Sequence, residues 1–349
     1  MGTMTGKETM VYEELDDGKV RCGVCPRRCV VDEGERGFCG VRENQDGKLI
    51  SLVYGKAVSS NVDPIEKKPL FHFAPGTRAL SIATVGCNLR CDFCQNFRIS
   101  QDWEKISGKD MMPEDVIEEA NRYRCQGIAY TYTEPTVFME YSYDTMVEAS
   151  PELYNVFVSN GYMTEETVKR IAPRLDAINV DLKGSEDFYR EHCGVPDSEP
   201  VFSALKKLSE HDLLIEVTNL VIPYINDSEE EIRERVRWIK ENLGRDTPVH
   251  FSRFRPAYKL TDKPSTPVET LERAVEIGKE EGLYHVYCGN VPGHKSESTY
   301  CPKCQNLLIK RHGFSVQEFK LTEGMRCYNC GEEINIGGEP WIPDKLFKD

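Results

Sequence analysis

From residue 78 onward, the chain alternates between short apolar segments and longer amphipathic segments. The apolar segments lie at residues 78–85, 127–133, 153–159, 176–182, 213–222 and 248–254, with a further candidate at 283–288. Near-continuous apolar runs of this length are typical of strands that are buried on both faces of a sheet. Six or more successive βα units predict a parallel sheet with right-handed crossovers. We therefore expect a complete or incomplete β/α barrel, with an open doubly wound sheet as the structural alternative.

The amphipathic segments have recognisable helix boundaries. Pro113 stands at a first-turn position beside acidic residues, and Gly127 follows the end of that segment. A later segment begins with capping residues at 226–228 and ends near Gly244. Proline at the start, acidic first turns and glycine beyond the end are the ordinary signals of helices, which supports a helix in each of these connections.

Polar residues follow or end the predicted strands. They are Thr133, Glu134, Ser159, Asn160, Asp181, Lys183, Thr218, Asn219, His250 and Arg253. Each has an ordinary alternative role on its own, such as a loop carboxylate, a turn residue or a hydrogen-bonded core histidine. The carboxyl ends of parallel strands, however, open onto one side of a barrel, where active sites are built. Their repeated position at strand ends therefore predicts a common site.

Cysteine is the most informative part of the composition. The chain has 14 cysteines, and its N-terminal residues have no apolar segment typical of an export signal. Thiols in a reducing compartment serve as metal ligands more often than as disulfides. We accordingly expect a soluble, cytoplasmic protein with several metal sites, in which the isolated Cys125, Cys193 and Cys288 are inert core residues.

Two sets of four cysteines flank the βα region. Near the end, "CPKC" and "CYNC" supply Cys301, Cys304, Cys327 and Cys330 with the spacing of a zinc ribbon. Near the start, Cys22, Cys25, Cys29 and Cys39 have a less regular spacing that suits either zinc or an auxiliary iron–sulfur cluster. The predicted domains are an N-terminal metal-binding segment at 1–77, a barrel at 78–290 and a C-terminal zinc-ribbon-like segment at 291–349.

A third set, in "GCNLRCDFCQN", contains only Cys87, Cys91 and Cys94. A [4Fe-4S] cluster has four irons, each of which is normally bound by one cysteine. Three thiolates leave one iron without a protein ligand, and catalytic metal sites keep such a position open. The set therefore predicts a cluster that binds a substrate or cofactor directly.

This CxxxCxxC motif after the first strand, with Phe93 before the last cysteine, resembles the radical S-adenosylmethionine (SAM) superfamily. The resemblance implies a partial (β/α)6 barrel and a [4Fe-4S] cluster whose open iron chelates SAM. It also implies an oxidoreductase-like reaction: the reduced cluster cleaves SAM to a 5′-deoxyadenosyl radical, which abstracts hydrogen from a substrate. A one-electron donor such as ferredoxin or flavodoxin would supply the electron.

Within the superfamily, "GCNLRCDFCQN" and "DLK" are similar to pyruvate formate-lyase activating enzyme and its relatives. Motifs over nearly the whole chain more closely resemble the radical SAM enzyme of the AmmeMemoRadiSam system: "CGVCPRRC", "GFCGVR", "DPIEKKPLFHF", "TYTEPT", "DLKG", "HFSRFRPAY", "GNVPG" and the terminal cysteines. A cysteine-rich segment replaces the N-terminal signature of the activating enzymes. Activation of a glycyl-radical enzyme is therefore the alternative. The substrate is not identified by the sequence, and the position of the two flanks suggests the hypothesis of a protein or peptide docked on them.

The resemblance also implies roles for individual residues. Phe93, Asn96, Thr133, Glu134, Ser159, Asn160, Asp181 and Lys183 are expected to contact SAM. Glu134 stands where many relatives have a Gly-Gly-Glu turn for the SAM amino group, and Lys183 is a natural partner for the SAM carboxylate. Lys183, His250 and Arg253 are the candidate catalytic residues on the substrate side.

Two non-enzymatic classes are the rivals of this interpretation. A multi-cluster electron carrier would need a fourth cysteine near Cys94, and none occurs before Cys125. A zinc-ribbon protein that binds nucleic acid through residues 301–330 would gain from local lysines and arginines. The net charge of −14 argues against a nucleic-acid partner, and the chain has no apolar run of about 18 residues that could span a membrane.

Overall fold

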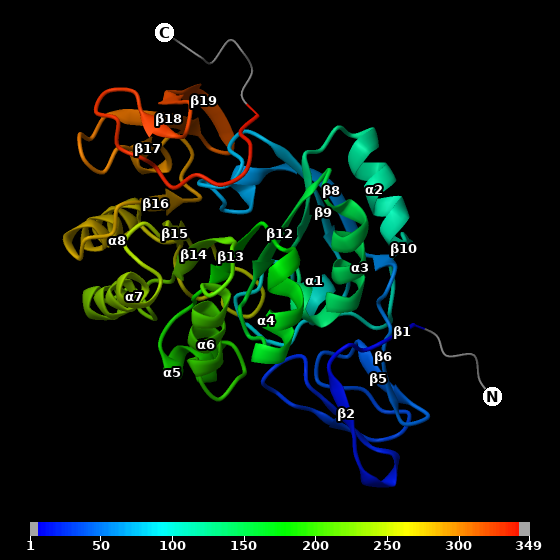
Figure 1. The fold of residues 1–349 in the computed structure, drawn as a ribbon. Helices are drawn as coiled ribbons and strands as arrows, with labels where there is room; N and C mark the ends of the chain where they lie inside the picture. Colours follow the sequence, from blue (N-terminus) through cyan, green and yellow to red (C-terminus); the bar gives the residue numbers. More distant parts are fainter. Residues whose placement is uncertain (1–5, 342–349) are drawn as a thin grey trace.

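A mostly parallel sheet forms the centre of the molecule (Figure 1), and the computed structural model describes residues 6–341. Its strand order is β16-β15-β14-β13-β12-β11-β9-β8. The strands are β8 (Ser59–Pro64), β9 (Arg78–Ala83), β11 (Gly127–Tyr130), β12 (Tyr154–Ser159), β13 (Ala177–Asp181), β14 (Leu214–Val221), β15 (Val249–Arg253) and β16 (Val286–Gly289). The predicted segments from 78–85 to 248–254 contain β9 and β11 to β15, and the segment 283–288 overlaps β16; these strands pair in parallel. The α/β fold with a mostly parallel sheet is thus confirmed.

The sheet also begins earlier than residue 78. β8 pairs antiparallel with β9 from Ser59↔Ala83 to Pro64↔Arg78. Its segment, SSNVDP, has no apolar run, because β8 is an edge strand with only Asp63 fully buried. The sequence pattern therefore missed this strand, and the residues before 78 contribute to the central sheet as well as to a cysteine-rich segment.

Helices connect the parallel strands in the expected places. They are α1 (Phe97–Ser100), α2 (Pro113–Arg122), α3 (Met139–Ala149), α4 (Glu165–Ile171), α5 (Glu186–His192), α6 (Glu199–Leu208), α7 (Glu229–Asn242) and α8 (Val268–Glu280). Pro113 is the first residue of α2, and the Ser228 hydroxyl accepts a hydrogen bond from the Glu231 N–H at the start of α7. In Figure 1, α2, α3, α4, α6, α7 and α8 follow one another from right to left in chain order, as expected for successive βα units.

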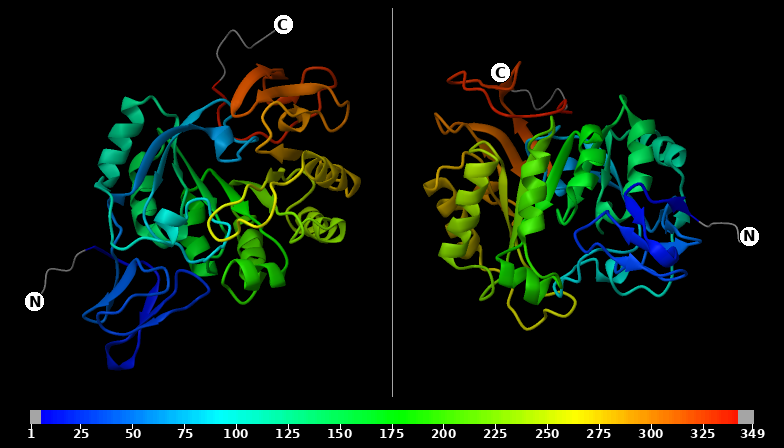
Figure 2. Two further views of the ribbon diagram at one scale, coloured as in Figure 1. Left: turned by 180° about the vertical axis from the view of Figure 1, so that it is seen from behind. Right: turned by 60° about the horizontal axis from the view of Figure 1, so that its bottom comes forward.

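The N-terminal segment forms two small antiparallel sheets beside the central sheet (Figure 2). One contains β2 (Tyr12–Glu14), β3 (Val20–Cys22) and β4 (Val30–Val31); the other contains β1 (Lys7–Glu8), β6 (Lys48–Ser51) and β5 (Arg42–Gln45). An ion pair of 2.7 Å joins Arg42 of β5 to Glu140 of α3, and both side chains are buried. A buried, hydrogen-bonded charge pair therefore connects the segment to the barrel.

The C-terminal segment has a small core of its own. Its strands are β17 (Thr299–Tyr300), β18 (Leu307–His312), β19 (Ser315–Phe319), β20 (Leu321–Thr322) and β21 (Arg326–Cys327). Leu308, Phe319 and Ile334 pack with two of the cysteines in a separate apolar cluster. The buried Arg311 donates hydrogen bonds to the Phe71 carbonyl (2.7 Å) and to the Thr299 hydroxyl (2.8 Å). This segment is thus anchored to the loop that follows β8.

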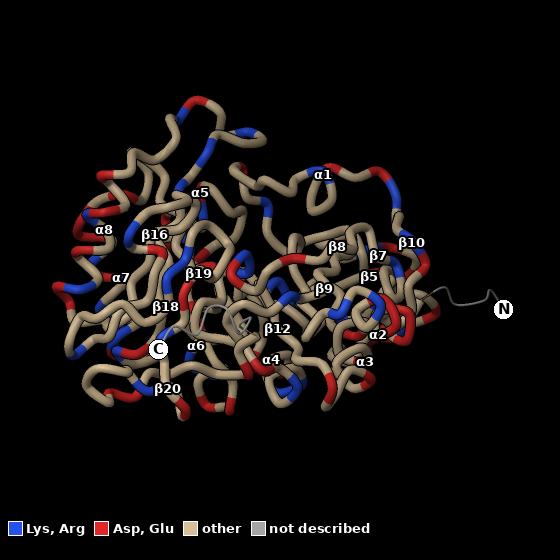
Figure 3. Tube along the Cα trace, turned by 90° about the horizontal axis from the view of Figure 1, so that it is seen from above, with Lys and Arg blue, Asp and Glu red and all other residues tan. Residues whose placement is uncertain are grey.

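The surface carries both signs of charge. Arg273 of α8 pairs with Glu229 of α7 at 2.8 Å, and Arg233 of α7 pairs with Glu280 of α8 at 2.5 Å. Figure 3 shows basic and acidic positions interspersed along these two helices. Among the described residues, no helix combines the length and the apolar composition that a membrane crossing requires.

Candidate active site

The three-cysteine loop follows β9 and leads into α1. It turns at Gly86, whose φ of +100° is in the left-handed region; a Cβ there would lie 2.6 Å from Val41 Cγ1 and 3.0 Å from the Cys39 carbonyl oxygen. Only glycine fits such a position without a shift of the neighbouring backbone. The start of the motif is therefore packed directly against the N-terminal cysteine-rich segment.

Distant parts of the chain hold the backbone of this loop in place. The N–H groups of Arg90 and Asp92 donate to the carbonyls of Cys193 (2.9 Å) and His192 (3.1 Å). The Arg90 guanidinium donates to the Cys87 carbonyl at 2.8 Å, and Gln101 Nε2 donates to the Cys91 carbonyl at 2.8 Å. These bonds preorganise the loop before any metal binds.

Cys87, Cys91 and Cys94 all line one cavity of about 570 Å³. Cys87 Sγ accepts a hydrogen bond from the Leu89 N–H at 3.4 Å, and Cys94 Sγ lies 3.3 Å from the Ser100 hydroxyl. Burial raises the pKa of Cys87 and of Cys94, so metal coordination at these thiols releases protons. Three thiols around a ligand-sized cavity are the donor set that a [4Fe-4S] cluster with one open iron requires.

The carboxylate of Glu134 organises the ends of β11 and β12. Its Oε1 accepts hydrogen bonds from the Thr136 N–H (3.0 Å), the Thr136 hydroxyl (2.6 Å) and the Ser159 hydroxyl (2.8 Å). Its Oε2 accepts from the Asn160 N–H at 2.8 Å. Burial raises the pKa of Glu134, although these hydrogen bonds oppose the shift. Oε1 thus accepts three of these hydrogen bonds and Oε2 only one, and Glu134 also lines the cavity, so its contact with the SAM amino group stays a prediction.

Glu134 thereby fixes two neighbours of the cysteine loop. Asn160 Nδ2 donates to the Asn88 side-chain oxygen at 2.8 Å and lies 3.7 Å from Cys87 Sγ. Asn88 in turn donates to the Tyr162 carbonyl at 2.7 Å. A chain of hydrogen bonds therefore runs from the Glu134 carboxylate to the turn that carries Cys87.

Asp181 and Lys183 form an ion pair at the end of β13. Lys183 Nζ lies 2.9 Å from Asp181 Oδ2 and 5.8 Å from the centre of the Phe93 ring. Burial opposes the charge on Lys183, but Asp181 and the thiols of Cys91 and Cys193 together raise its pKa well above the usual value. The side chain therefore presents a permanent positive charge beside the cysteine loop.

The parallel register aligns further polar residues with Asp181. Asp181 pairs with Thr218 of β14, and Thr218 pairs with His250 of β15. Thr218, His250 and Asp181 all line the cavity, and the buried Thr218 hydroxyl has no hydrogen-bond partner among residues 6–341. A buried polar atom that faces a cavity without a partner is costly unless a ligand or water satisfies it.

The two candidate catalytic residues on β15, His250 and Arg253, have different surroundings. His250 Nε2 lies 2.6 Å from Glu216 Oε2, its ring stacks on Tyr287, and it lines the cavity. Arg253 donates to the Thr266 carbonyl at 2.8 Å and is not among the residues that line the cavity. His250 is therefore placed to contact a ligand, whereas Arg253 supports the loop after β15. Phe93, Asn96 and Thr133 also line the cavity, as expected.

Sequence reasoning missed the lysines in the loop after β8. Lys67 and Lys68 line the cavity, although their motif, "DPIEKKPLFHF", gave no role to either residue. Lys68 is 2% exposed and pairs with Asp63 at 2.7 Å, and burial lowers its pKa to about 8. Two adjacent lysines directly before the apolar residues of "PLF" were the available signal.

The C-terminal cysteines are gathered as a metal site. Among residues 6–341, Cys301, Cys304, Cys327 and Cys330 are the only group of three or more candidate ligand residues whose ligand atoms all lie within 4.8 Å of one another. The Cys301–Cys330 and Cys304–Cys327 sulfur distances are both 3.6 Å. Hydrogen bonds, chiefly from Asn306, lower the pKa of Cys304 to about 6, which favours the thiolate that binds a metal.

The N-terminal cysteines are arranged differently. Cys22, Cys25, Cys29 and Cys39 line one small cavity together with Arg42 and Asn88. No three of their sulfurs lie within 4.8 Å of one another, unlike the C-terminal set.

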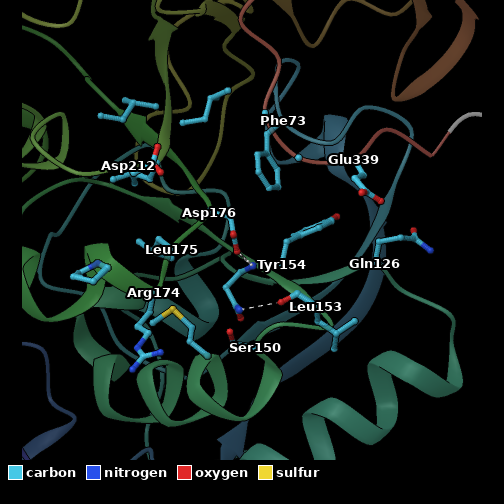
Figure 4. A pocket seen from close by; sticks show the side chains of 18 of the residues that line it. Phe73, Gln126, Ser150, Leu153, Tyr154, Arg174, Leu175, Asp176, Asp212 and Glu339 are labelled. Atoms are coloured by element: carbon cyan, nitrogen blue, oxygen red, sulfur yellow. Dashed lines mark hydrogen bonds between the residues drawn. The ribbon is translucent and has the colours of Figure 1, made fainter. Parts of the chain in front are cut away.

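A second, larger cavity lies at the opposite ends of the strands. It has a volume of about 1100 Å³, and Figure 4 shows Tyr154, Asp176 and Arg174 among the residues that line it. Asp176 accepts a hydrogen bond from the Asn155 N–H at 2.7 Å. None of the strand-end residues expected at the active site lines this cavity. Because active sites in parallel barrels lie at the carboxyl ends of the strands, the smaller cavity is the candidate site.

Comparisons with known proteins give a family for the region that contains the three-cysteine loop. A family model described as "Radical SAM superfamily" matches residues 81–239. Uncharacterized protein MJ0808 of Methanocaldococcus jannaschii is 50% identical over 95% of this chain and 99% of its own. Pyruvate formate-lyase-activating enzyme of Clostridium pasteurianum is 20% identical over 59% of this chain and 92% of its own. A radical SAM methyltransferase from Sphaerobacter thermophilus has a similar fold, with a TM-score of 0.50 and 15% identity over 67% of this chain and 71% of that one.

Proposed function

Because residues 81–239 form a radical SAM superfamily domain, we propose that the chain is an enzyme that cleaves SAM reductively and abstracts hydrogen from a substrate in the 570 Å³ cavity. The observation that carries this proposal is that the three thiols, the Asp181–Lys183 pair and the partnerless Thr218 hydroxyl line the same cavity. The bound cluster would supply the electron that breaks the SAM sulfonium bond. Ferredoxin or flavodoxin is the class of donor that we propose for it.

The residues of this chain would position SAM in the following way. Cys87, Cys91 and Cys94 hold the cluster, and Asn160 lies within reach of both Cys87 and the cavity. Lys183 offers a charge for the SAM carboxylate, and Phe93, Asn96, Thr133 and Ser159 complete the wall. His250 and the unpartnered Thr218 lie farther along the sheet, on the side where we place the substrate.

We propose a protein or peptide as the substrate. The cavity is bordered by Lys67 and Lys68 from the loop after β8 and by Phe314 from the tip of the β18–β19 hairpin. Phe314 is 45% exposed, so an apolar side chain stands at the rim of the cavity. Basic and apolar groups from the C-terminal segment and the β8 loop suit a chain that lies across the rim. Activation of a glycyl-radical enzyme is the second candidate, favoured by the similarity to the activating enzyme of Clostridium pasteurianum.

The motifs along the whole chain support a finer assignment. We propose that the protein belongs to the AmmeMemoRadiSam group of radical SAM enzymes and acts in the cytoplasm, where thiols remain reduced for metal binding. The number of free cysteines agrees with such a compartment, since all 14 are unpaired.

The proposed activity is tested by anaerobic reconstitution. Protein supplied with iron, sulfide, dithionite and SAM should release 5′-deoxyadenosine and methionine, measured by liquid chromatography. Protein that contains the cluster, binds SAM and forms neither product would refute the proposal.

The Glu134→Gln variant should bind SAM about 10-fold more weakly, a difference of about 1.4 kcal/mol. The amide group replaces one acceptor oxygen by a donor, so the bonds to Thr136, Ser159 and Asn160 cannot all be kept. Isothermal titration with SAM measures the effect. The matched control is Glu148→Gln, at an exposed position of α3, and an equal loss in both variants would contradict the positioning role of Glu134.

We also propose that the C-terminal cysteines bind zinc. A Zn–S bond of about 2.3 Å places tetrahedral thiolates about 3.8 Å apart, close to the 3.6 Å found here. The Cys304→Ser variant should lose about one zinc per chain, measured by elemental analysis. Lys303→Ala, an exposed change in the same turn, should keep its zinc; undiminished zinc in Cys304→Ser would show that the metal lies elsewhere.

A further inference from the structure

The four N-terminal cysteines lie around one small cavity. Cys22, Cys25, Cys29 and Cys39 all line it. The sulfur of Cys29 accepts a hydrogen bond from the Phe38 N–H at 3.5 Å. A ligand in this cavity would therefore lie beside all four thiols.

A buried cation faces the same cavity with an unused donor. Arg42 lines the cavity and is 2% exposed. Its two terminal nitrogens donate to Thr9, Val137 and Glu140, but its Nε has no partner among the described residues. A buried N–H without an acceptor is destabilising. An anionic group between the four sulfurs would supply that acceptor, so this observation points independently to a ligand.

The spacing of the sulfurs excludes a single metal ion in this geometry. Four thiolates around one zinc or one iron must lie about 3.8 Å apart, as the C-terminal set does at 3.6 Å. No three of the N-terminal sulfurs lie within even 4.8 Å of one another. A four-iron cluster places its iron and sulfide atoms between the cysteines and therefore separates the thiolates more widely.

We propose that Cys22, Cys25, Cys29 and Cys39 bind an auxiliary [4Fe-4S] cluster, and that Arg42 Nε donates a hydrogen bond to it. Each of the four irons would be bound by one cysteine, so no iron would be open to a substrate or cofactor. The site lies against the catalytic loop: Asn88, the neighbour of Cys87, lines its cavity, and the Cys39 carbonyl oxygen lies 3.0 Å from the position that a Cβ at Gly86 would take. The inference concerns a separate metal site and does not depend on SAM cleavage.

Metal and sulfide analysis of the anaerobically reconstituted full-length protein tests this proposal. The wild type should contain about eight irons, about eight acid-labile sulfides and about one zinc per chain. The Cys25→Ala/Cys39→Ala variant should keep about four irons and one zinc. The Cys87→Ala/Cys91→Ala/Cys94→Ala variant should also keep about four irons, now at the N-terminal site alone, with the electron paramagnetic resonance of a reduced [4Fe-4S] cluster.

The outcomes separate this proposal from the proposed function. About four irons and two zincs per wild-type chain would overturn it, since zinc would then occupy the N-terminal cysteines. Iron without labile sulfide in the triple variant would also overturn it, by showing a mononuclear site. A variant that misfolds would not obscure the result, because the wild-type iron, sulfide and zinc contents already discriminate these outcomes.

Discussion

Replacing Cys91 with alanine should abolish the formation of 5′-deoxyadenosine from SAM. Cys91 lines the cavity with Cys87 and Cys94, and the other two thiols cannot hold a four-iron cluster between them. The variant should lose about four irons per chain and give only the rate of cluster-free protein. Liquid chromatography of the nucleoside, with iron analysis of the same sample, measures both effects.

Cys125→Ala is the matched control for this prediction. Cys125 is also buried, at 5% exposed, but it lines the cavity at the opposite ends of the strands. It should keep the iron content and the rate of the wild type. A Cys91→Ala protein that retains full iron and full activity would show that the catalytic metal is held elsewhere.

Much of the fold was predictable because the central strands are buried. The segments that became β9 and β11 to β15 consist mainly of apolar residues that have no exposed face, and each predicted segment contains its strand. β8 escaped prediction for the opposite reason, since its only fully buried residue is the charged Asp63. Edge strands lack the two-sided burial that makes a continuous apolar run, so their position depends on tertiary pairing.

The location of the site was also predictable in part. Parallel register brings the ends of successive strands to one edge, so Ser159, Asp181 and His250 could be expected beside the cysteine loop. The hydrogen-bond partners of the individual side chains could not be predicted from the sequence. The four hydrogen bonds of Glu134 link residues from the ends of two strands and the turn after β11, and they exist only because β11 and β12 are adjacent.

The kind of metal group that each flanking cysteine set can bind likewise depends on the three-dimensional structure. Both sets have four cysteines; the N-terminal set contains one CxxC pair and the C-terminal set contains two. Their difference is the separation of the sulfurs, which depends on how the intervening residues fold: the C-terminal turns bring all four within 4.8 Å, and the N-terminal loops do not. Ligand count alone therefore identifies a closed site without identifying its metal.

The Glu140→Leu variant should lower the free energy of unfolding by roughly 3–5 kcal/mol. Glu140 is fully buried and accepts hydrogen bonds from both terminal nitrogens of Arg42 (3.1 and 2.7 Å) and from the Met10 N–H (3.0 Å). Its removal leaves the two terminal nitrogens of the buried guanidinium without their carboxylate partner at the junction between the N-terminal segment and α3. Urea unfolding under anaerobic conditions measures the loss. Glu148→Leu, an exposed change on the same helix, should shift stability by less than about 0.5 kcal/mol.

The double variant Arg42→Met/Glu140→Leu shows whether Glu140→Leu destabilises the protein through the unpaired charge of Arg42 or through lost packing. If the uncompensated guanidinium is the cause, removing it should restore a large part of the lost stability, because apolar residues of similar size can replace a buried ion pair. A double variant as unstable as Glu140→Leu would contradict this explanation. Iron analysis of the same samples separates the two roles of Arg42. Loss of its ion pair with Glu140 should lower the stability of the junction. Loss of its Nε should lower only the iron content held by Cys22, Cys25, Cys29 and Cys39.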